Sequence, residues 1–431
     1  MKNISINDNA AHWNLSGYLL IYSLVILMMI DDIDRYRIII FSSLGILLLV
    51  SFWAIASNGV KVWITIEHGF AFLFIVYGLI SNAWCIDRHL TTYMAEWLSL
   101  YFVIYFCLSN YLLLTDNINK FVKQITYAGF LVSVFCVLAY RGPGFVNALL
   151  SGERIGRRLF GINSNTLGLT CATVFVISIS LYYSERHLKW ILMGIIPAII
   201  TLGSGSRKAF SVLLGGTVIL FLYYSIIEGS YKVIAIIKFV IKISIVLFGL
   251  YLIISLPAFV SIHDRVDGLI SAYFDESEDE TLSDIGEDSK VSDEFRQKMV
   301  DLGIEQFKET PVFGVGLNNA QIINKRKLHF NAYLHNNYIE ILVNGGIIGF
   351  LLYYSFFCTL ILKHICILRM NNDPLAFLSL TLLFLRLLTE WGSVQYFSPT
   401  NVIYYSFWIA VANRTDSYFN AGEPGGLSRV H

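Results

Sequence analysis

The sequence predicts an all-α protein that crosses a membrane about twelve times. Of its 431 residues, 56% are hydrophobic and only 14% are charged, whereas a soluble domain has about one quarter charged residues. Several apolar runs are as long as a spanning helix, which disfavours the shorter alternating strands of a β-barrel. The formal net charge is zero, so no overall field favours binding to nucleic acid.

The predicted spans lie near residues 15–30, 36–56, 62–80, 90–114, 121–140, 167–183, 188–202, 209–227, 233–256, 338–362, 374–391 and 400–413. They divide the chain into a first membrane part (1–254), a long polar segment (255–337), a second membrane part (338–413) and a tail (414–431). Lys and Arg are more frequent in the short loops on the side of the N-terminus. We therefore expect both termini in the cytoplasm and the polar segment outside.

The middle of the polar segment, residues 275–294, is strongly acidic and is expected to be a solvated, mobile excursion. From Glu294 to Lys308, apolar residues recur at helical spacing. This pattern predicts an amphipathic helix that lies along the membrane surface. Thr310 and Pro311 are expected to end it, and Gly314 and Gly316 to turn the chain.

Four clusters of chemically active residues fall on the predicted outer face. The first contains Arg154, Arg157 and Arg158, which share one side if that piece is helical. The run Asn163 to Asn165 follows and is a good cap for the next helix, whose N-terminus favours anions. Arginine binds phosphate oxygens in forked geometry. The alternative is a positive flank anchored among lipid headgroups.

The second cluster is Ser206, Arg207 and Lys208, in a glycine-rich turn between two spans. A charge near the end of a span usually has a partner or water, and an anionic ligand shared with the first cluster would supply one. The alternative is a charge that snorkels to the surface. The third cluster, Arg296 with Lys298, is equally consistent with a solvated helix face.

The fourth cluster is His335, followed by Asn336, Asn337 and Tyr338 at the start of a span. An imidazole with its ordinary pKa of about 6.5 can accept or give a proton near neutrality. The alternative is a capping or hydrogen-bonded interfacial histidine. A single histidine would favour that alternative, but the cationic clusters on the same face make a reaction at an anionic group the better interpretation.

Together the clusters suit the transfer of a group from a lipid-anchored diphosphate. The arginines would stabilise the negative charge that grows on the leaving phosphate, and the histidine would activate an incoming hydroxyl. No metal site is expected, because His263, His329 and His335 lack zinc-type spacing. No nucleotide-binding loop appears.

The order of these motifs resembles the O-antigen ligase and polymerase family of bacterial envelopes. The resemblance covers roughly 152–349 and rests on Arg157-Arg158-Leu-Phe-Gly161 with Asn163-Ser-Asn165, Gly-Ser206-Arg207, Glu309-Thr-Pro311-Val-Phe-Gly314-Val-Gly316, Leu334-His335-Asn336-Asn337-Tyr338 and Gly345-Gly346-Ile-Ile-Gly349. Asn-Ser-Asn replaces the more usual Asn-Pro-Asn.

The resemblance implies a metal-independent glycosyltransferase without a cofactor, with a GT-C-like helical fold in the bacterial inner membrane and a site facing the periplasm. Its donor would be an oligosaccharide linked to undecaprenyl diphosphate. By carry-over, Arg154, Arg157, Arg158, Arg207 and Lys208 would bind the diphosphate, and His335, Arg207 and Arg296 would be catalytic. The supporting residues would be Asn163, Asn165, Ser206, Asn336, Asn337 and Tyr338.

The acceptor separates the family's activities. A polymerase joins two lipid-linked repeat units and would work with a chain-length regulator, a ligase transfers glycan to lipid A–core, and a third group transfers it to protein. We favour the polymerase because such proteins are the most numerous in the family. The alternative of another class is a transporter of lipid-linked oligosaccharide, which would need buried charges. Arg386 and Glu390, one helical turn apart, are instead expected to form a structural ion pair.

Overall fold

The computed structural model describes residues 15–30, 35–57, 62–151, 153–156, 163–228, 284–330 and 332–421, with the single positions 240, 241, 244 and 249. Within these ranges every regular element is a helix. The predicted all-α class is therefore confirmed for the described part of the chain. The helices are α1 (Leu15–Met29), α2 (Arg37–Ser57), α3 (Ile66–Ile80) with a 3-10 turn (Ser81–Ala83), α4 (Arg88–Thr115), α5 (Ile118–Ala139), α6 (Pro143–Leu150), α7 (Ser164–Glu185), α8 (Lys189–Gly203), α9 (Arg207–Glu228), α12 (Asp284–Glu309), α13 (Ala320–Leu328), α14 (Asn337–Met370), α15 (Pro374–Glu390) and α16 (Asn401–Ala421).

A multi-pass membrane protein is supported by the length and composition of these helices. Seven of the described segments could cross a bilayer on these criteria: Arg37–Ser57, Ile66–Ala83, Arg88–Thr115, Ile118–Ala139, Ser164–Glu185, Arg207–Ile227 and Asn337–Met370. Two shorter helices, α1 and α8, are also apolar. Each predicted span coincides with a helix except 233–256, which lies outside the described residues apart from single positions. The total of twelve spans stays a prediction.

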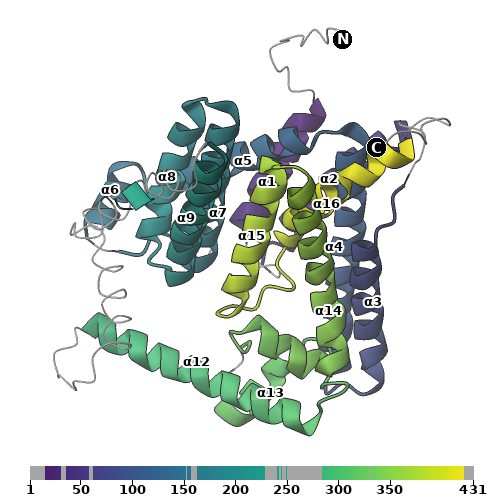
Figure 1. Ribbon diagram of the computed structural model, residues 1–431. Helices are drawn as coiled ribbons and strands as arrows, with labels where there is room; N and C mark the ends of the chain where they lie inside the picture. The colour runs from purple at the N-terminus through teal and green to yellow at the C-terminus, as the bar shows by residue number, and fades with distance from the viewer. Residues whose placement is uncertain are drawn as a thin grey trace.

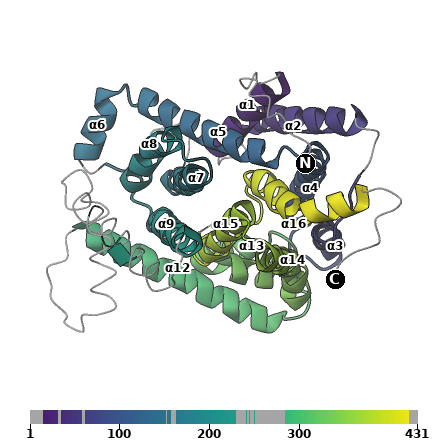
Figure 2. The ribbon, with the colours of Figure 1, turned by 45° about the horizontal axis from the view of Figure 1, so that its top comes forward.

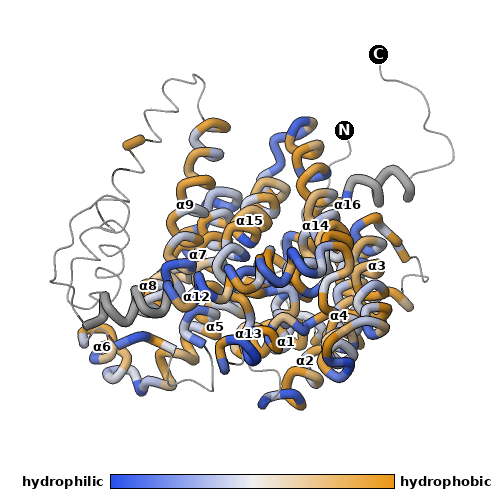
Figure 3. The backbone as a smooth tube through the Cα atoms, turned by 90° about the horizontal axis from the view of Figure 1, so that it is seen from below, coloured by the Kyte–Doolittle hydropathy of each residue, from blue (hydrophilic) through white to orange (hydrophobic). Residues whose placement is uncertain are grey.

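The long helices form a bundle, and α12 runs across one end of it (Figures 1 and 2). In this bundle α7 packs on both α8 and α9. Helix α9 also packs on α15, and α14 packs on α3 and α15. The end of α16 lies at the opposite end of the bundle from α12 (Figure 1). The polar helices α12 and α13 therefore form a layer over one end only, which Figure 3 shows from below.

Helix α12 is longer than the predicted amphipathic helix. It begins at Asp284, ten residues before Glu294, so the second half of the acidic segment is helical. That this segment is solvated and mobile stays a prediction. Residues 275–283 lie outside the described part. The helix ends at Glu309, as the following Thr-Pro predicts. Met299 is buried against α13 and the start of α14 in a small core with Val315, Ile323, Leu334 and Val343.

Helix α14 is interrupted at Gly346, where the sequence predicts one continuous span. Gly346 has φ 60° and ψ −164°, outside helical geometry. The chain that follows α12 lies in this kink: the Val315 N–H donates to the Val343 carbonyl at 2.9 Å, and the Ile347 N–H donates to the Pro311 carbonyl at 2.9 Å. The backbone groups that the kink releases from the helix are thus paired with the inserted segment.

Glycine is required at this crossing because backbone approaches backbone. A Cβ at Gly346 would lie 2.2 Å from the Val312 carbonyl oxygen, and a Cβ at Gly314 would lie 2.5 Å from the Gly346 nitrogen. Both residues also have positive φ, a conformation that L-residues seldom adopt. The crossing anchors the C-terminal end of α12 to the kink of α14.

Candidate functional site

A cavity of about 530 Å³ opens at the end of the bundle that carries α12. Its lining comes from α7, α9, α15 and α16, from Arg296 on α12, from the turn before α14 and from the connection between α15 and α16. Its volume is within the range of about 300–1,000 Å³ that is typical of small-molecule sites. Its lining includes three basic side chains, Lys208, Arg296 and Arg386, and the imidazole of His335.

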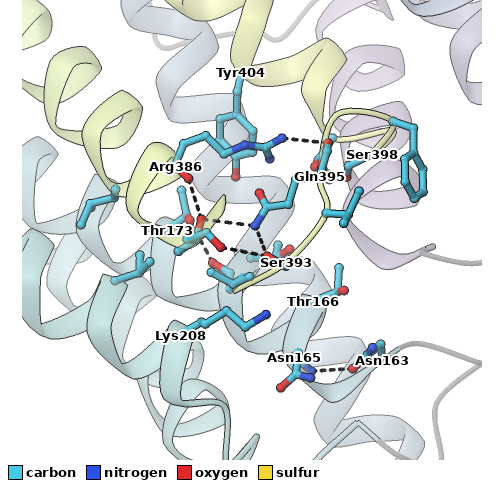
Figure 4. A pocket seen from close by; sticks show the side chains of 18 of the residues that line it. Asn163, Asn165, Thr166, Thr173, Lys208, Arg386, Ser393, Gln395, Ser398 and Tyr404 are labelled. Carbon is cyan, nitrogen blue, oxygen red and sulfur yellow. Dashed lines mark hydrogen bonds between the residues drawn. The ribbon is translucent and has the colours of Figure 1, made fainter. Parts of the chain in front are cut away.

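The N-terminus of α7 faces this cavity. Asn163 is the N-cap, and its side-chain oxygen accepts the Asn165 N–H at 2.9 Å. Asn163, Asn165 and Thr166 line the cavity (Figure 4). The start of a helix presents unpaired N–H groups and the positive end of the helix dipole, so this wall favours an anion.

Lys208 contributes the second positive feature, from the first turn of α9. The preceding turn is tight: Gly205 has φ +62°, and the buried Ser206 hydroxyl accepts the Ala209 N–H at 3.4 Å. Lys208 lines the cavity, and its ammonium group donates to the Gly392 carbonyl at the end of α15. The preceding residue, Arg207, is half-buried and does not line the cavity.

Arg296 on α12 and His335 close the cavity from the polar layer. His335 has φ +56°, in the left-handed region that non-glycine residues seldom occupy. Its turn is fixed by the buried Glu340, whose carboxylate accepts the Leu334 N–H at 2.9 Å and the Asn344 amide at 3.1 Å. The imidazole is therefore held by its backbone at the edge of the cavity.

The pKa of His335 is lowered to about 4, first by burial and then by the positive charges of Arg296 and Lys208. The imidazole is therefore neutral near pH 7 and has a nitrogen that can accept a proton. The same cations would hold an anion beside it. An anion bound there would offset their charges and raise the pKa of His335, so the histidine would become a stronger base when such a ligand is present.

Part of the chain matches a known protein family. Residues 192–354 match the family model described as O-antigen ligase. The matched segment, less than half of the chain, supports the resemblance to the O-antigen ligase and polymerase family. It contains Lys208, Arg296 and His335, whereas the start of α7 and the α15–α16 connection lie outside it. No curated protein matches the chain.

Asn337 lies in the matched segment and binds the α15–α16 connection. Its side-chain oxygen accepts the N–H groups of Gln395 at 3.0 Å and Tyr396 at 3.2 Å. Its amide donates to Glu390 at 3.0 Å and to the Tyr354 hydroxyl at 3.2 Å. The residue is fully buried, and both its side-chain oxygen and its side-chain amide have hydrogen-bond partners.

Two neighbours of Asn337 also have local roles. Asn336 caps α14 by accepting the Ile339 N–H at 3.2 Å. The Tyr338 hydroxyl donates to the Leu387 carbonyl at 2.8 Å, and its ring stacks on Tyr354 with centroids 5.0 Å apart. None of these predicted supporting residues lines the cavity; they fix the start of α14 beside His335.

The predicted first cluster is placed only in part. Arg157 and Arg158 lie outside the described residues. Arg154 is described in the non-helical stretch 153–156, so the predicted sharing of a helix face does not hold there, and it does not line the cavity. The neighbouring Ile155 N–H donates to the Gly203 carbonyl at 2.9 Å, so this stretch packs against the end of α8.

The sequence interpretation missed the α15–α16 connection. Arg386 and Glu390 form the expected ion pair, with Nε and Oε1 3.1 Å apart, but Arg386 also lines the cavity. The connection adds Ser393, Gln395, Phe397 and other residues to the lining. The available signal was the run Trp-Gly-Ser-Val-Gln-Tyr-Phe-Ser-Pro-Thr at 391–400, which is polar and aromatic between two apolar helices.

Proposed function

We propose that the chain is a membrane glycosyltransferase that polymerises lipid-linked oligosaccharide repeat units. The donor is an oligosaccharide on undecaprenyl diphosphate, and the acceptor is a hydroxyl of a second lipid-linked unit. The reaction takes place at the periplasmic end of the bundle. The family match supports the general class of enzyme, and the cavity supports the roles of individual residues.

One observation carries the proposal. Lys208, Arg296 and His335 come from three separate elements, α9, α12 and the turn before α14, and line one cavity. The N-terminus of α7 faces the same space. Two cationic side chains and a helix start form a site for an anion, and a neutral imidazole next to an anion site is arranged for proton transfer during group transfer.

The chemistry follows from this arrangement. The acceptor oxygen attacks the anomeric carbon of the donor, and the bond between that carbon and the phosphate oxygen breaks. The acceptor proton passes to His335, and the lipid diphosphate leaves with the bonding electrons. Lys208 and Arg296 stabilise the charge that grows on the leaving oxygen, which lowers the barrier.

The rest of the cavity suits a lipid donor. Beside Lys208, the walls from α7, α9 and α15 carry Leu169, Val212, Leu382 and Leu385. Apolar side chains next to a cationic site fit a molecule whose diphosphate is bonded directly to an isoprenoid chain.

A ligase is the second candidate. The matching family model is described as O-antigen ligase, and the same donor site would serve transfer to lipid A–core. Only the acceptor differs between the two reactions, so the test must follow the product.

The test compares Arg296→Met with Lys298→Met in a deletion strain, with glycans separated on gels. Both cations lie on α12, but Lys298 is exposed and does not line the cavity. For a polymerase, Arg296→Met removes long chains while single repeat units persist. For a ligase, it leaves lipid A–core bare and lipid-linked polymer accumulates. Lys298→Met is expected to give the wild-type glycan pattern in either case. Normal glycan in both Arg296→Met and His335→Ala would contradict the proposal.

A further inference from the structure

The half of the cavity lined by the end of α15 and residues 393–400 differs from the half around Lys208, although Lys208 donates to the Gly392 carbonyl at the border between them. Most of its lining side chains are polar without a charge, or aromatic, namely Thr389, Ser393, Gln395, Phe397, Ser398 and Thr400, and Val394 and Pro399 add aliphatic surface. Figure 4 shows Gln395 and Ser398 on the side of Arg386, Lys208 and Asn165 on the other side, and Ser393 between them. This connection lies outside the matched residues 192–354.

Arg386 is the single charged side chain among the lining residues of this half, and its charge is balanced. Its Nε donates to Glu390 at 3.1 Å, and its terminal nitrogen donates to the Gln395 carbonyl at 2.8 Å. Glu390 is fully buried and also accepts hydrogen bonds from Tyr353 and Tyr354. The ion pair therefore leaves this half with no net charge to attract an anion.

The connection is rigid before any ligand binds. The Asn401 amide donates to the carbonyls of Gln395 at 2.8 Å and Tyr396 at 3.0 Å. The Gln395 amide donates to the hydroxyls of Thr389 at 3.2 Å and Ser393 at 2.6 Å. Together with the hydrogen bonds that the Gln395 and Tyr396 N–H groups donate to Asn337, these contacts fix the backbone of the connection and the Gln395 side chain. A ligand therefore loses little free energy to ordering the loop.

An aromatic surface completes this half. Phe397 and Tyr333 both line the cavity, are half-buried, and have ring centroids 4.8 Å apart. Aromatic rings present a negative face that attracts polarised C–H groups. Amides and hydroxyls beside such a face can bind the hydroxyls of the same molecule. An uncharged sugar ring, with one face of C–H groups and a rim of hydroxyls, has this combination.

We propose that the α15–α16 connection is a subsite for the uncharged sugar that is bonded to the donor diphosphate. This rests on the proposed function and adds the position of the glycan to it. The donor carries an anion and a sugar within one bond of each other, and the cavity carries a cationic half and a neutral half side by side. Phe397 and Ser398 contact the sugar, while Lys208 and Arg296 hold the phosphates.

The test measures binding of two lipids to the purified full chain in nanodiscs. One is undecaprenyl diphosphate without sugar, and the other is the lipid-linked glycan extracted from a strain that lacks the protein. Phe397→Leu keeps the apolar volume and removes the ring, so it is expected to weaken binding of the glycan-bearing lipid about tenfold. Binding of the bare lipid remains within about twofold, which also shows that the variant is folded.

Trp391→Leu is the matched control, because Trp391 is an aromatic residue of the same connection that is 73% exposed and does not line the cavity. It is expected to change neither affinity. Ser398→Ala weakens only the glycan-bearing lipid, and Lys208→Met weakens both lipids. The subsite is overturned if Phe397→Leu and Ser398→Ala weaken both lipids equally or weaken neither. If the wild type binds neither lipid, the proposed function fails and the subsite fails with it.

Discussion

Gly346→Ala tests whether the kink in α14 positions the polar layer over the cavity. Gly346 has φ +60°, and an added Cβ would lie 2.2 Å from the Val312 carbonyl oxygen and 2.6 Å from the Phe313 nitrogen. Both contacts are with backbone atoms, so no side-chain rotation can relieve them. The inserted segment must move away from α14, and its backbone hydrogen bonds to the kink must lengthen.

The size of the effect follows from two costs. The backbone of Gly346 (φ 60°, ψ −164°) lies in a region that only glycine adopts readily, and another residue there costs roughly 1–3 kcal/mol. Forcing an extra carbon into a packed site costs about 1–3 kcal/mol more. We expect Gly346→Ala to lose about 2–6 kcal/mol of stability. Activity should also fall, because the displaced segment follows directly after α12, which carries Arg296.

The neighbouring glycine is the control. A Cβ at Gly345 would meet only the Tyr77 ring at 3.5 Å, an ordinary contact. Gly345→Ala is therefore expected to keep wild-type stability. The assay is thermal unfolding of the purified protein in detergent, followed by glycan transfer. Equal melting temperatures for Gly346→Ala and Gly345→Ala would refute the reasoning that the kink requires glycine.

Three further predictions concern the cavity. The pKa of His335 is about 4, and the neutral imidazole is the active form, so kcat/KM should fall only as the pH falls toward 4. Arg296→Met removes a nearby positive charge and raises the pKa of His335, so this loss of kcat/KM should begin at a higher pH. An unchanged pH profile would argue against His335 as the base. Lys208→Met should raise KM for the donor at least tenfold, as a lost charged hydrogen bond does, and an unchanged KM would exclude Lys208 from the diphosphate site. Asn337→Ala should lower stability by about 3 kcal/mol, because it leaves the N–H groups of Gln395 and Tyr396 without their partner and removes one of the hydrogen bonds to Glu390; an unchanged melting temperature would contradict this.

The helices were predictable because each carries its own signal. Apolar runs of spanning length marked the membrane helices, Thr310 with Pro311 marked the end of α12, and Asn163 marked the start of α7. These are local effects of hydropathy, backbone conformation and capping. The kink at Gly346 was not predictable in the same way, because it depends on the segment around Pro311, thirty-five residues earlier, entering the helix.

The sequence predicted which kinds of residue form the candidate site, but not which of them line the same cavity. Sequence indicated a cation in the turn before α9, and the structure places Lys208 in the cavity and Arg207 outside its lining. Neighbouring residues on a helix point about 100° apart, so the facing side depends on how α9 packs against α15. Arg386 was correctly paired with Glu390, but its position in the cavity depends on the α15–α16 connection, which no local pattern fixes.

The pairing of Arg386 explains how one cavity can hold two chemically different parts of a substrate. An unbalanced guanidinium in this half would attract the diphosphate as strongly as Lys208 and Arg296 do, and the donor could bind in two opposite orientations. Glu390 removes that competing site, at the cost of a buried ion pair that must be fully hydrogen-bonded. Tyr353, Tyr354 and Asn337 supply those hydrogen bonds. Under the proposed function, the same network that holds the start of α14 would therefore direct the diphosphate toward His335.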